Sequence, residues 1–220
     1  MWWSPKVNSK EINTKEQIIR VATELFASNG FEGTSVRDIA TSAKVNLAAV
    51  NYHFKNKENL YFEVFNHCYQ RMEEDILNIG KDKALNTQEF SWKVLEYFVD
   101  NGSSLLNTFR IIFSEKLSSH QKLPCISNKD EMKMGPPGKE MILEKITEDV
   151  GDGVPISGRH WAMRVIFANV FHFSLMSNIP FVKNRAEEIP FFLPNERKRS
   201  IYFLVDAVLS HLKQNISNWE

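Results

Sequence analysis

Apolar residues recur at helical spacing along almost the whole chain, and this periodicity constrains the fold more than any other feature. Between residues 14 and 29 one face of a 3.6-residue helix carries Ile18, Ala22, Leu25 and Phe26. The strand signal is weak throughout. We therefore predict an all-α fold, with a compact N-terminal three-helix unit followed by a larger C-terminal helical bundle.

Capping residues set the expected boundaries of the first helices. Thr14 with Gln17 fits a capping box at the start of the first helix. The pair Asn29-Gly30 supplies a left-handed stop at its end. Ser35 with Asp38 three residues later opens the second helix in the same way. The expected N-terminal helices are 14–29, 35–43 and 47–54.

The helical pattern continues from Asn56, which can cap a long fourth helix. The stretches 121–137 and 180–194 contain several prolines and are expected to be loops. The expected helices after Asn56 are 57–79, 87–101, 104–119, 138–150, 158–178 and 195–216.

Two short helices joined by a tight turn, 35–43 and 47–54, predict a helix-turn-helix over residues 35–54. At about 100° per residue, Leu47 and Phe54 fall within about 60° of Val50 and form a stripe expected to be buried. The opposite face is small at its start and polar further on. Asn can pair with adenine, and Ala can touch a thymine methyl group. The outward face and its flanks carry Ala48, Ala49, Asn51 and Tyr52.

Groups suited to phosphate binding flank this helix pair. Thr34 and Ser35 stand at a helix N-terminus, where free N–H groups and the dipole favour an anion. Arg37 can reach a phosphate or a base. His53 lies near the core boundary, which favours backbone contact over base reading. The basic residues after the second helix of the pair are Lys55 and Lys57.

The formal net charge of the 220-residue chain is zero, which by itself argues weakly against a nucleic-acid binder. The charge is unevenly distributed, however. Residues 1–57 contain eight Lys/Arg and five Asp/Glu, a net +3, and the remaining 19 basic and 22 acidic residues give −3. A modestly basic N-terminal unit therefore precedes a mildly acidic body.

Other features exclude several protein classes. The two cysteines, Cys68 and Cys125, cannot form a disulfide framework, and no long apolar run suggests a membrane span. The N-terminus lacks a signal-peptide pattern, so we expect a cytoplasmic protein. We find no phosphate-binding glycine loop, no HExxH, no GxSxG and no metal-ligand spacing. We therefore predict no enzyme activity, no metal and no cofactor.

The N-terminal run TKEQIIRVATELFASNGFEGTSVRDIATSAKVNLAAVNYHFKNKENLYFEVF resembles the DNA-binding domain of the tetracycline-repressor (TetR) family of transcriptional regulators. The resemblance covers about residues 12–66 and leaves 67–220 as a helical regulatory and dimerisation domain. The residues that carry it, in the family's order and spacing, are Ala22, Leu25, Phe26, Gly30, Thr34, Ile39, Ala40, Val45, His53, Phe54, Lys57, Glu58 and Leu60.

This resemblance implies an Ω-shaped homodimer that places the third helix of each subunit in a major groove of a palindromic operator. The C-terminal helices would bind an inducer and dimerise. By position, the base or groove contacts are Arg37, Leu47, Ala48, Ala49 and Asn51. The implied phosphate contacts are Thr34, Ser35, Tyr52, His53 and Lys57.

The chain departs from the family pattern at four positions. Lys44 replaces the usual turn glycine, which costs about 1–2 kcal/mol if the residue is left-handed. Asn46 replaces Ser or Thr as the helix cap and is an equally good cap. It is also among the predicted DNA-binding residues. Ala48 replaces Gly, and Asn51 replaces Tyr, with Tyr52 beside it. The last two changes lie on the reading face, so the operator sequence does not transfer from relatives.

The C-terminal half is rich in aromatic residues at helical spacing. Such residues are usually core, but some can line an apolar ligand pocket. The pocket candidates are Phe109, Phe113 and His172, although the alternative for His172 is a core or interface histidine.

Two C-terminal helices have more than one apolar face, and such helices must bury more than one side. Pairing them with their symmetry mates gives a four-helix dimer interface, whereas the alternative is a purely intrachain core. The interface candidates are Trp161, Val165, Ala168, Leu204, Val208 and Leu212.

These features together predict a DNA-binding transcriptional regulator, with repression following from the family resemblance. We expect a small, mostly apolar inducer to release it from a palindromic operator. The alternative is a constitutive DNA-binding or protein-interaction module without a small-molecule ligand.

Overall fold

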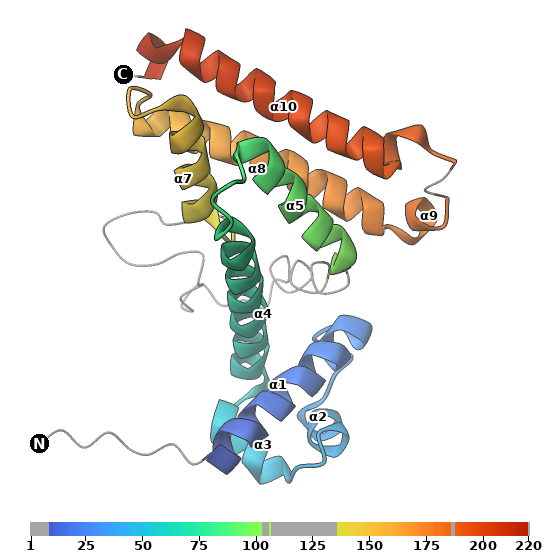
Figure 1. Ribbon diagram of the computed structural model, residues 1–220. Coiled ribbons are helices and arrows are strands. Elements are labelled where there is room, and N and C mark those ends of the chain that lie inside the picture. The colour runs from blue at the N-terminus through green and yellow to red at the C-terminus, as the bar shows by residue number, and fades with distance from the viewer. Residues whose placement is uncertain (1–8, 103–105, 107–135, 186–187, 220) are drawn as a thin grey trace, which may run out of the picture. The chain divides into compact units, whose positions relative to one another are not determined.

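The computed structural model describes residues 9–102, 106, 136–185 and 188–219. Within these ranges the chain forms helices joined by turns and loops, without any strand (Figure 1). The all-α prediction is confirmed. Apart from residue 106, the expected helix over 104–119 lies outside the described residues, as does most of the expected loop over 121–137. The described chain divides into two compact units between Tyr69 and Gln70.

The N-terminal unit is built from three helices and the first part of a fourth. α1 packs against α2, and α2 packs against α3. Buried apolar side chains from each layer meet in the centre, among them Ile18, Ile39 and Leu60, all with no solvent exposure. The helices are α1 (Ser9–Asn29), α2 (Val36–Ser42), α3 (Leu47–Phe54) and α4 (Lys57–Gly80).

The start of α1 differs from the prediction. The helix begins at Ser9, so Thr14 lies inside it and is not its N-cap. The Gln17 side chain instead donates a hydrogen bond to the Ala43 carbonyl at 2.8 Å. The predicted stop is confirmed, because Gly30 has φ +73° and its N–H bonds to the Phe26 carbonyl.

The C-terminal unit contains the end of α4 and the remaining helices. α5 packs against α8 and α10, and α7 packs mainly against α8 (Figure 1). Phe90, Leu95, Ile166 and Val205 fill its core. The helices are α5 (Thr87–Asp100), α7 (Lys139–Val150), α8 (Ile156–Asn178), α9 (Pro180–Lys183) and α10 (Pro194–Gln214), with 3₁₀ turns η1 (Pro190–Phe192) and η2 (Ile216–Trp219).

The stretch 180–194 is not simply a loop. Each of its prolines, Pro180, Pro190 and Pro194, stands in the first turn of a helical segment. Proline fits there because its missing N–H would have no intrahelical partner and its φ already suits a helix. The prolines that suggested irregular chain therefore begin α9, η1 and α10.

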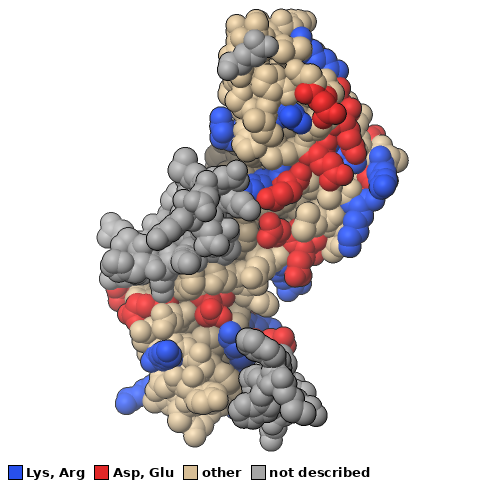
Figure 2. All heavy atoms as spheres, turned by 90° about the vertical axis from the view of Figure 1, so that its left-hand side faces the viewer, with Lys and Arg blue, Asp and Glu red and all other residues tan. Residues whose placement is uncertain are grey.

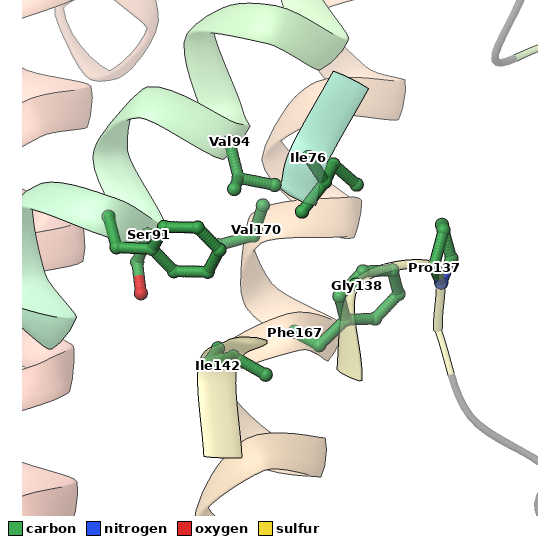
Figure 3. Close-up of a pocket in the computed structure, with 9 residues that line it drawn as sticks. Ile76, Ser91, Val94, Pro137, Gly138, Ile142, Phe167 and Val170 are labelled. Atoms are coloured by element: carbon green, nitrogen blue, oxygen red, sulfur yellow. The ribbon is translucent and has the colours of Figure 1, made fainter. Parts of the chain in front are cut away.

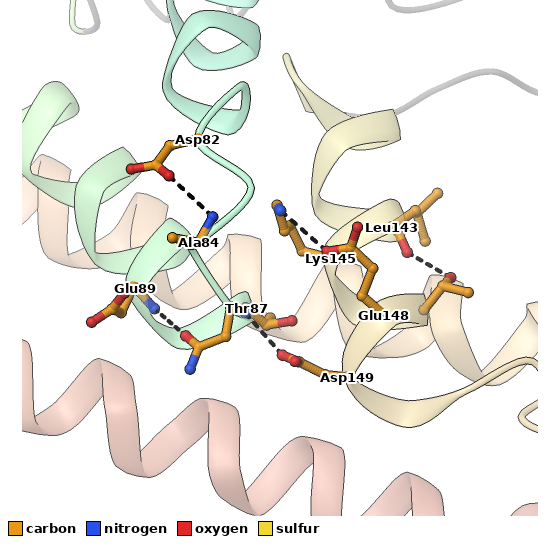
Figure 4. A network of polar contacts seen from close by, with 10 residues as sticks. Asp82, Ala84, Thr87, Glu89, Leu143, Lys145, Glu148 and Asp149 are labelled. Atoms are coloured by element: carbon orange, nitrogen blue, oxygen red, sulfur yellow. Dashed lines mark hydrogen bonds and ion pairs between the residues drawn. The ribbon is translucent and has the colours of Figure 1, made fainter.

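Polar contacts fasten the start of α5 to the end of α7 (Figure 4). The Thr87 N–H donates to Asp149 Oδ2 at 2.9 Å, and Asn86 caps α5 through the Glu89 N–H. Lys145, almost fully buried, pairs with Glu148 at 3.1 Å. Of these contacts, the Thr87–Asp149 bond joins the two helices, and the other two lie within α5 and α7.

Candidate nucleic-acid interface

The turn before α2 is held by a buried threonine. The Thr34 hydroxyl donates to the carbonyls of Leu25 and Gly30, at 3.1 and 2.9 Å, and the residue is 1% exposed. Its side chain therefore faces the domain interior. The predicted phosphate contact of Thr34 cannot come from this hydroxyl, whose role is to fix the end of α1 against the start of α2.

A full capping box starts α2, as the sequence predicts. The Ser35 hydroxyl accepts from the Asp38 N–H at 3.1 Å, and the Asp38 carboxylate accepts from both the Ser35 hydroxyl and its N–H. The Ser35 hydroxyl bond and then the backbone bond lower the pKa of Asp38. The chain's own carboxylate thus occupies the helix terminus at which the sequence suggested a phosphate.

The turn between α2 and α3 is tight and contains a left-handed lysine. Lys44 has φ +53°, and the Val45 N–H bonds back to the Ala40 carbonyl at 3.0 Å. Asn46 then caps α3 by accepting from the Ala48 N–H. α3 begins at Leu47 and ends at Phe54, as predicted.

One face of α3 is open to solvent. Val50 and Phe54 are buried against the domain, whereas Ala48 and Asn51 are exposed. Tyr52 is 74% exposed, and the centre of its ring lies 5.2 Å from that of the His53 ring in an edge-to-face arrangement. The predicted reading surface is therefore presented outward, and Ala49 and His53 lie half-buried at its edges.

Leu47 does not join the buried stripe. It is 36% exposed and occupies the first position of α3. This corrects its assignment to the buried stripe. It stays among the predicted groove contacts.

Lys57 is engaged inside the domain. Its ammonium donates to the carbonyls of Phe31 and Thr34, at 2.9 and 3.1 Å, and lies 4.1 Å from the centre of the Phe31 ring. Phe31 packs in turn on Phe26 and Tyr61. The structure thus gives Lys57 a bracing role between α4 and the turn before α2, where sequence reasoning expected a phosphate contact.

The exposed cations around α3 are Arg37, Lys44 and Lys55. Lys55 ends α3 with φ +67° and ψ −50°, and the Asn56 N–H bonds to the Phe54 carbonyl at 2.8 Å, a strained γ-turn. Among the described residues other than glycine, only Lys44 and Lys55 have positive φ. Sequence reasoning did not include Lys44 in the site, although a lysine in place of glycine was the available signal.

The predicted ligand residues do not converge on one site. Phe109 and Phe113 lie outside the described residues. His172 is exposed on α8 with its ring edge-on to that of Phe173, so it is not a core histidine, and it lines none of the described pockets. It lies across the helix from Val170, which together with Phe167 lines an apolar pocket (Figure 3).

The predicted dimer residues separate into two groups. Ala168 is exposed, and Trp161, Val165 and Leu204 are half-buried. Val208 and Leu212 are buried inside the C-terminal unit, at 5% and 0% exposure, so they belong to its own core and not to an interface. The sequence missed Phe203, which is 76% exposed on α10.

In Figure 2, Asp and Glu side chains gather over the C-terminal unit, in keeping with the negative net charge of residues 58–220. Within the described ranges, His, Cys, Asp and Glu side chains form no group that could hold a metal ion. No described helix is long and apolar enough to cross a membrane.

Comparison with known proteins identifies the N-terminal unit. Residues 18–64 match the family described as bacterial regulatory proteins, tetR family. YttP of Bacillus subtilis is 34% identical over 90 residues, 41% of this chain and 42% of YttP. The HTH-type transcriptional regulator QacR of Staphylococcus aureus is 40% identical over 55 residues, 25% of this chain and 29% of QacR.

A third relative is the biofilm operon icaADBC HTH-type negative transcriptional regulator IcaR of Staphylococcus aureus, 33% identical over 85 residues, 39% of this chain and 45% of IcaR. The matched segments thus span less than half of each of these relatives. These relatives are regulators and not enzymes, in agreement with the prediction.

Solved structures extend the likeness to the rest of the fold. A structure described as the molecular basis for control of antibiotic production by bacterial hormones matches with a TM-score of 0.63 at 22% identity, covering 88% of this chain and 97% of that one. A TetR-family regulator from Streptomyces coelicolor matches with a TM-score of 0.50 at 16% identity, covering 94% of this chain and 99% of that one. Residues 18–64 therefore match the DNA-binding region of the tetR family of bacterial regulatory proteins, and the chain as a whole shares an all-α fold with these solved structures.

Proposed function

We propose that the chain is a DNA-binding transcriptional regulator that reads a palindromic operator with α3. The observation that carries the proposal is the outward face of α3, where Ala48, Asn51 and Tyr52 are exposed on a helix anchored by Val50 and Phe54. Small side chains permit close approach to base edges, and an amide can pair with adenine in the major groove. A DNA target would place the protein in the cytoplasm.

Two exposed neighbours on this face have different proposed roles. Asn51 faces base edges and reads sequence, whereas Tyr52 contacts the phosphate backbone and adds affinity at every site. Removing a base-reading side chain relaxes specificity at particular positions, by about 1–3 kcal/mol per contact, and removing a backbone contact weakens all sites alike.

Fluorescence anisotropy with a selected operator and with single-base variants of it tests this division. Asn51→Ala should reduce discrimination at one base pair in each half-site, while Tyr52→Ala should weaken the whole panel equally. Gln70→Ala, an exposed change on α4 beyond the N-terminal unit, is the control and should alter neither. Equal, sequence-independent losses for Asn51→Ala and Tyr52→Ala would refute the assignment.

A homodimer supplies the second reading helix. Phe203 and Ala207 on α10 and Ala168 on α8 are apolar residues exposed on two helices that pack against each other. A second copy can cover these residues by a two-fold interface, and two-fold protein symmetry calls for a palindromic site.

Repression and release by a small apolar inducer complete the proposal. IcaR, a relative, is named a negative regulator, and a neighbour of similar fold is a complex of SmeT with triclosan, at a TM-score of 0.53 and 16% identity. The apolar pocket of Figure 3 contains Ile76 of α4, Ile142 of α7 and Phe167 of α8. A ligand that separates these walls would displace α4, whose first turns belong to the DNA-binding unit.

One observation favours the alternative of a regulator or interaction module without a ligand. The pocket volume is about 10 Å³, which is room for about one water molecule. An inducer must therefore open the pocket, and binding would show as a raised melting temperature. A thermal-shift screen of apolar compounds separates the two functions: stabilisation together with loss of operator binding supports an inducer, and the absence of both supports the constitutive module.

A further inference from the structure

A second, larger pocket lies at the other end of the C-terminal unit, where α9 and η1 connect α8 to α10 (Figure 1). Its volume is about 290 Å³. Apolar side chains form most of its wall, with Val99 from α5, Val182 from α9 and Phe192 from η1. Its size lies at the lower end of the roughly 300–1,000 Å³ typical of small-molecule sites.

A partly buried arginine forms the polar wall of this pocket. Arg197 of α10 donates from Nη1 to Ser177 Oγ at 3.1 Å. Its Nε is buried, and nothing in the described parts of the chain accepts a hydrogen bond from it. A buried donor without an acceptor is costly, and such groups in native proteins call for an explanation.

The charges around Arg197 differ on its two sides. Among the residues that the structure describes, the charged side chains lining the 290 Å³ pocket are Arg197 and Lys183, and none of its described lining residues is acidic. A neighbouring pocket of about 220 Å³ shares Arg197 but is lined by Glu96 and Asp100. Neither carboxylate forms a described ion pair with the guanidinium. Burial lowers the pKa of Arg197, and the charges of Asp100 and Glu96 act in the opposite direction. An anion is therefore favoured on the Lys183 side.

We propose that this pocket binds a small amphipathic carboxylate, with its carboxyl group on Arg197 and its apolar body against Val99, Val182 and Phe192. A carboxylate matches the guanidinium because it can accept two parallel N–H bonds from it. The apolar wall of Val99, Val182 and Phe192 suits a short alkyl chain. The site is separate from the pocket of Figure 3, and the inference does not depend on DNA binding.

Isothermal titration calorimetry of the full chain with octanoate, 1-octanol and octylammonium tests the proposal without DNA. The three probes share one alkyl chain and differ in charge. Octanoate should bind at least about tenfold more tightly than the other two, because only it can pair with Arg197. Equal binding of the three probes, or no binding of octanoate, would overturn the proposal.

Variants locate the site. Arg197→Gln should weaken octanoate about tenfold and leave octanol unchanged, and Arg197→Lys should give an intermediate loss. Arg199→Gln is the matched control, because Arg199 is an exposed arginine on the same helix. If Arg199→Gln lost as much affinity as Arg197→Gln, octanoate would be responding to general charge and the assignment would be wrong. Should Arg197→Gln not fold, the comparison of probes on the unaltered chain still decides.

Discussion

Replacing Lys57 with methionine separates a structural lysine from a DNA-contacting one. Methionine keeps an unbranched stem but removes the ammonium that donates to the Phe31 and Thr34 carbonyls. Hydrogen bonds from charged donors contribute about 1.5–3 kcal/mol. Lys57 is half-buried, and its contact with the Phe31 ring adds about 0.5–1 kcal/mol at such a site. Because the half-buried ammonium remains partly solvated and the methionine stem keeps its packing, the sum of these contributions is discounted, and we expect a net loss of about 2 kcal/mol in the stability of the N-terminal unit.

Hydrogen–deuterium exchange of the full chain measures this loss locally. Backbone amides of residues 31–43 should exchange about 30-fold faster in Lys57→Met, the equivalent of about 2 kcal/mol. Lys55→Met is the matched control, since Lys55 is exposed and two residues away. It should leave exchange unchanged but weaken DNA binding.

The competing result is also specific. Lys57 would be a phosphate contact if Lys57→Met left exchange over 31–43 unchanged but made the slope of log DNA affinity against log salt concentration shallower. The expected decrease in that slope is about one for each α3 bound to DNA. The bracing role derived from its two carbonyl partners would then be wrong.

Three further perturbations test other parts of the account. Lys44→Gly should raise the free energy of unfolding by about 0.5–1 kcal/mol, because relief of about 1–2 kcal/mol of left-handed strain exceeds the entropic cost of glycine. The urea midpoint should rise accordingly, and an unchanged or lower midpoint would contradict this. Asp38, whose folded pKa is lowered by Ser35, contributes stability at neutral pH that is lost as pH falls through that folded pKa, so Asp38→Asn should flatten the acid limb of stability against pH; an identical acid limb would count against the capping box. Phe203→Glu should convert a dimer to a monomer in sedimentation velocity, and a persistent dimer would move the interface elsewhere.

The helix-turn-helix could be predicted closely from the sequence because local chemistry determines it. α3 has the predicted bounds, and Ser35 and Asn46 cap their helices as expected. Both caps are contacts between residues two or three positions apart, which a sequence pattern records directly.

Errors occurred where distant residues decide the outcome. Thr14 and Gln17 fit a capping box, but Gln17 bonds to Ala43 across the domain. Lys57 fits a phosphate contact, but two carbonyls from the turn after α1 converge on it. No local pattern records either partner.

The orientation of α10 shows the same limit. It has apolar residues on more than one side, and periodicity does not say which side meets α5 and α8. Burial places Val208 and Leu212 in the core and leaves Phe203 outside. The face open to a partner could therefore be recognised only after the intrachain contacts were known.

Selection of bound sites from random DNA tests the central claim, that α3 of a dimer reads a palindrome, most directly. The account predicts an enriched inverted repeat whose two half-sites present the same bases in successive major grooves, and the loss of one conserved position in each half when Asn51→Ala is used. Enrichment of no motif, or of a single asymmetric site unaffected by Asn51→Ala, would contradict it.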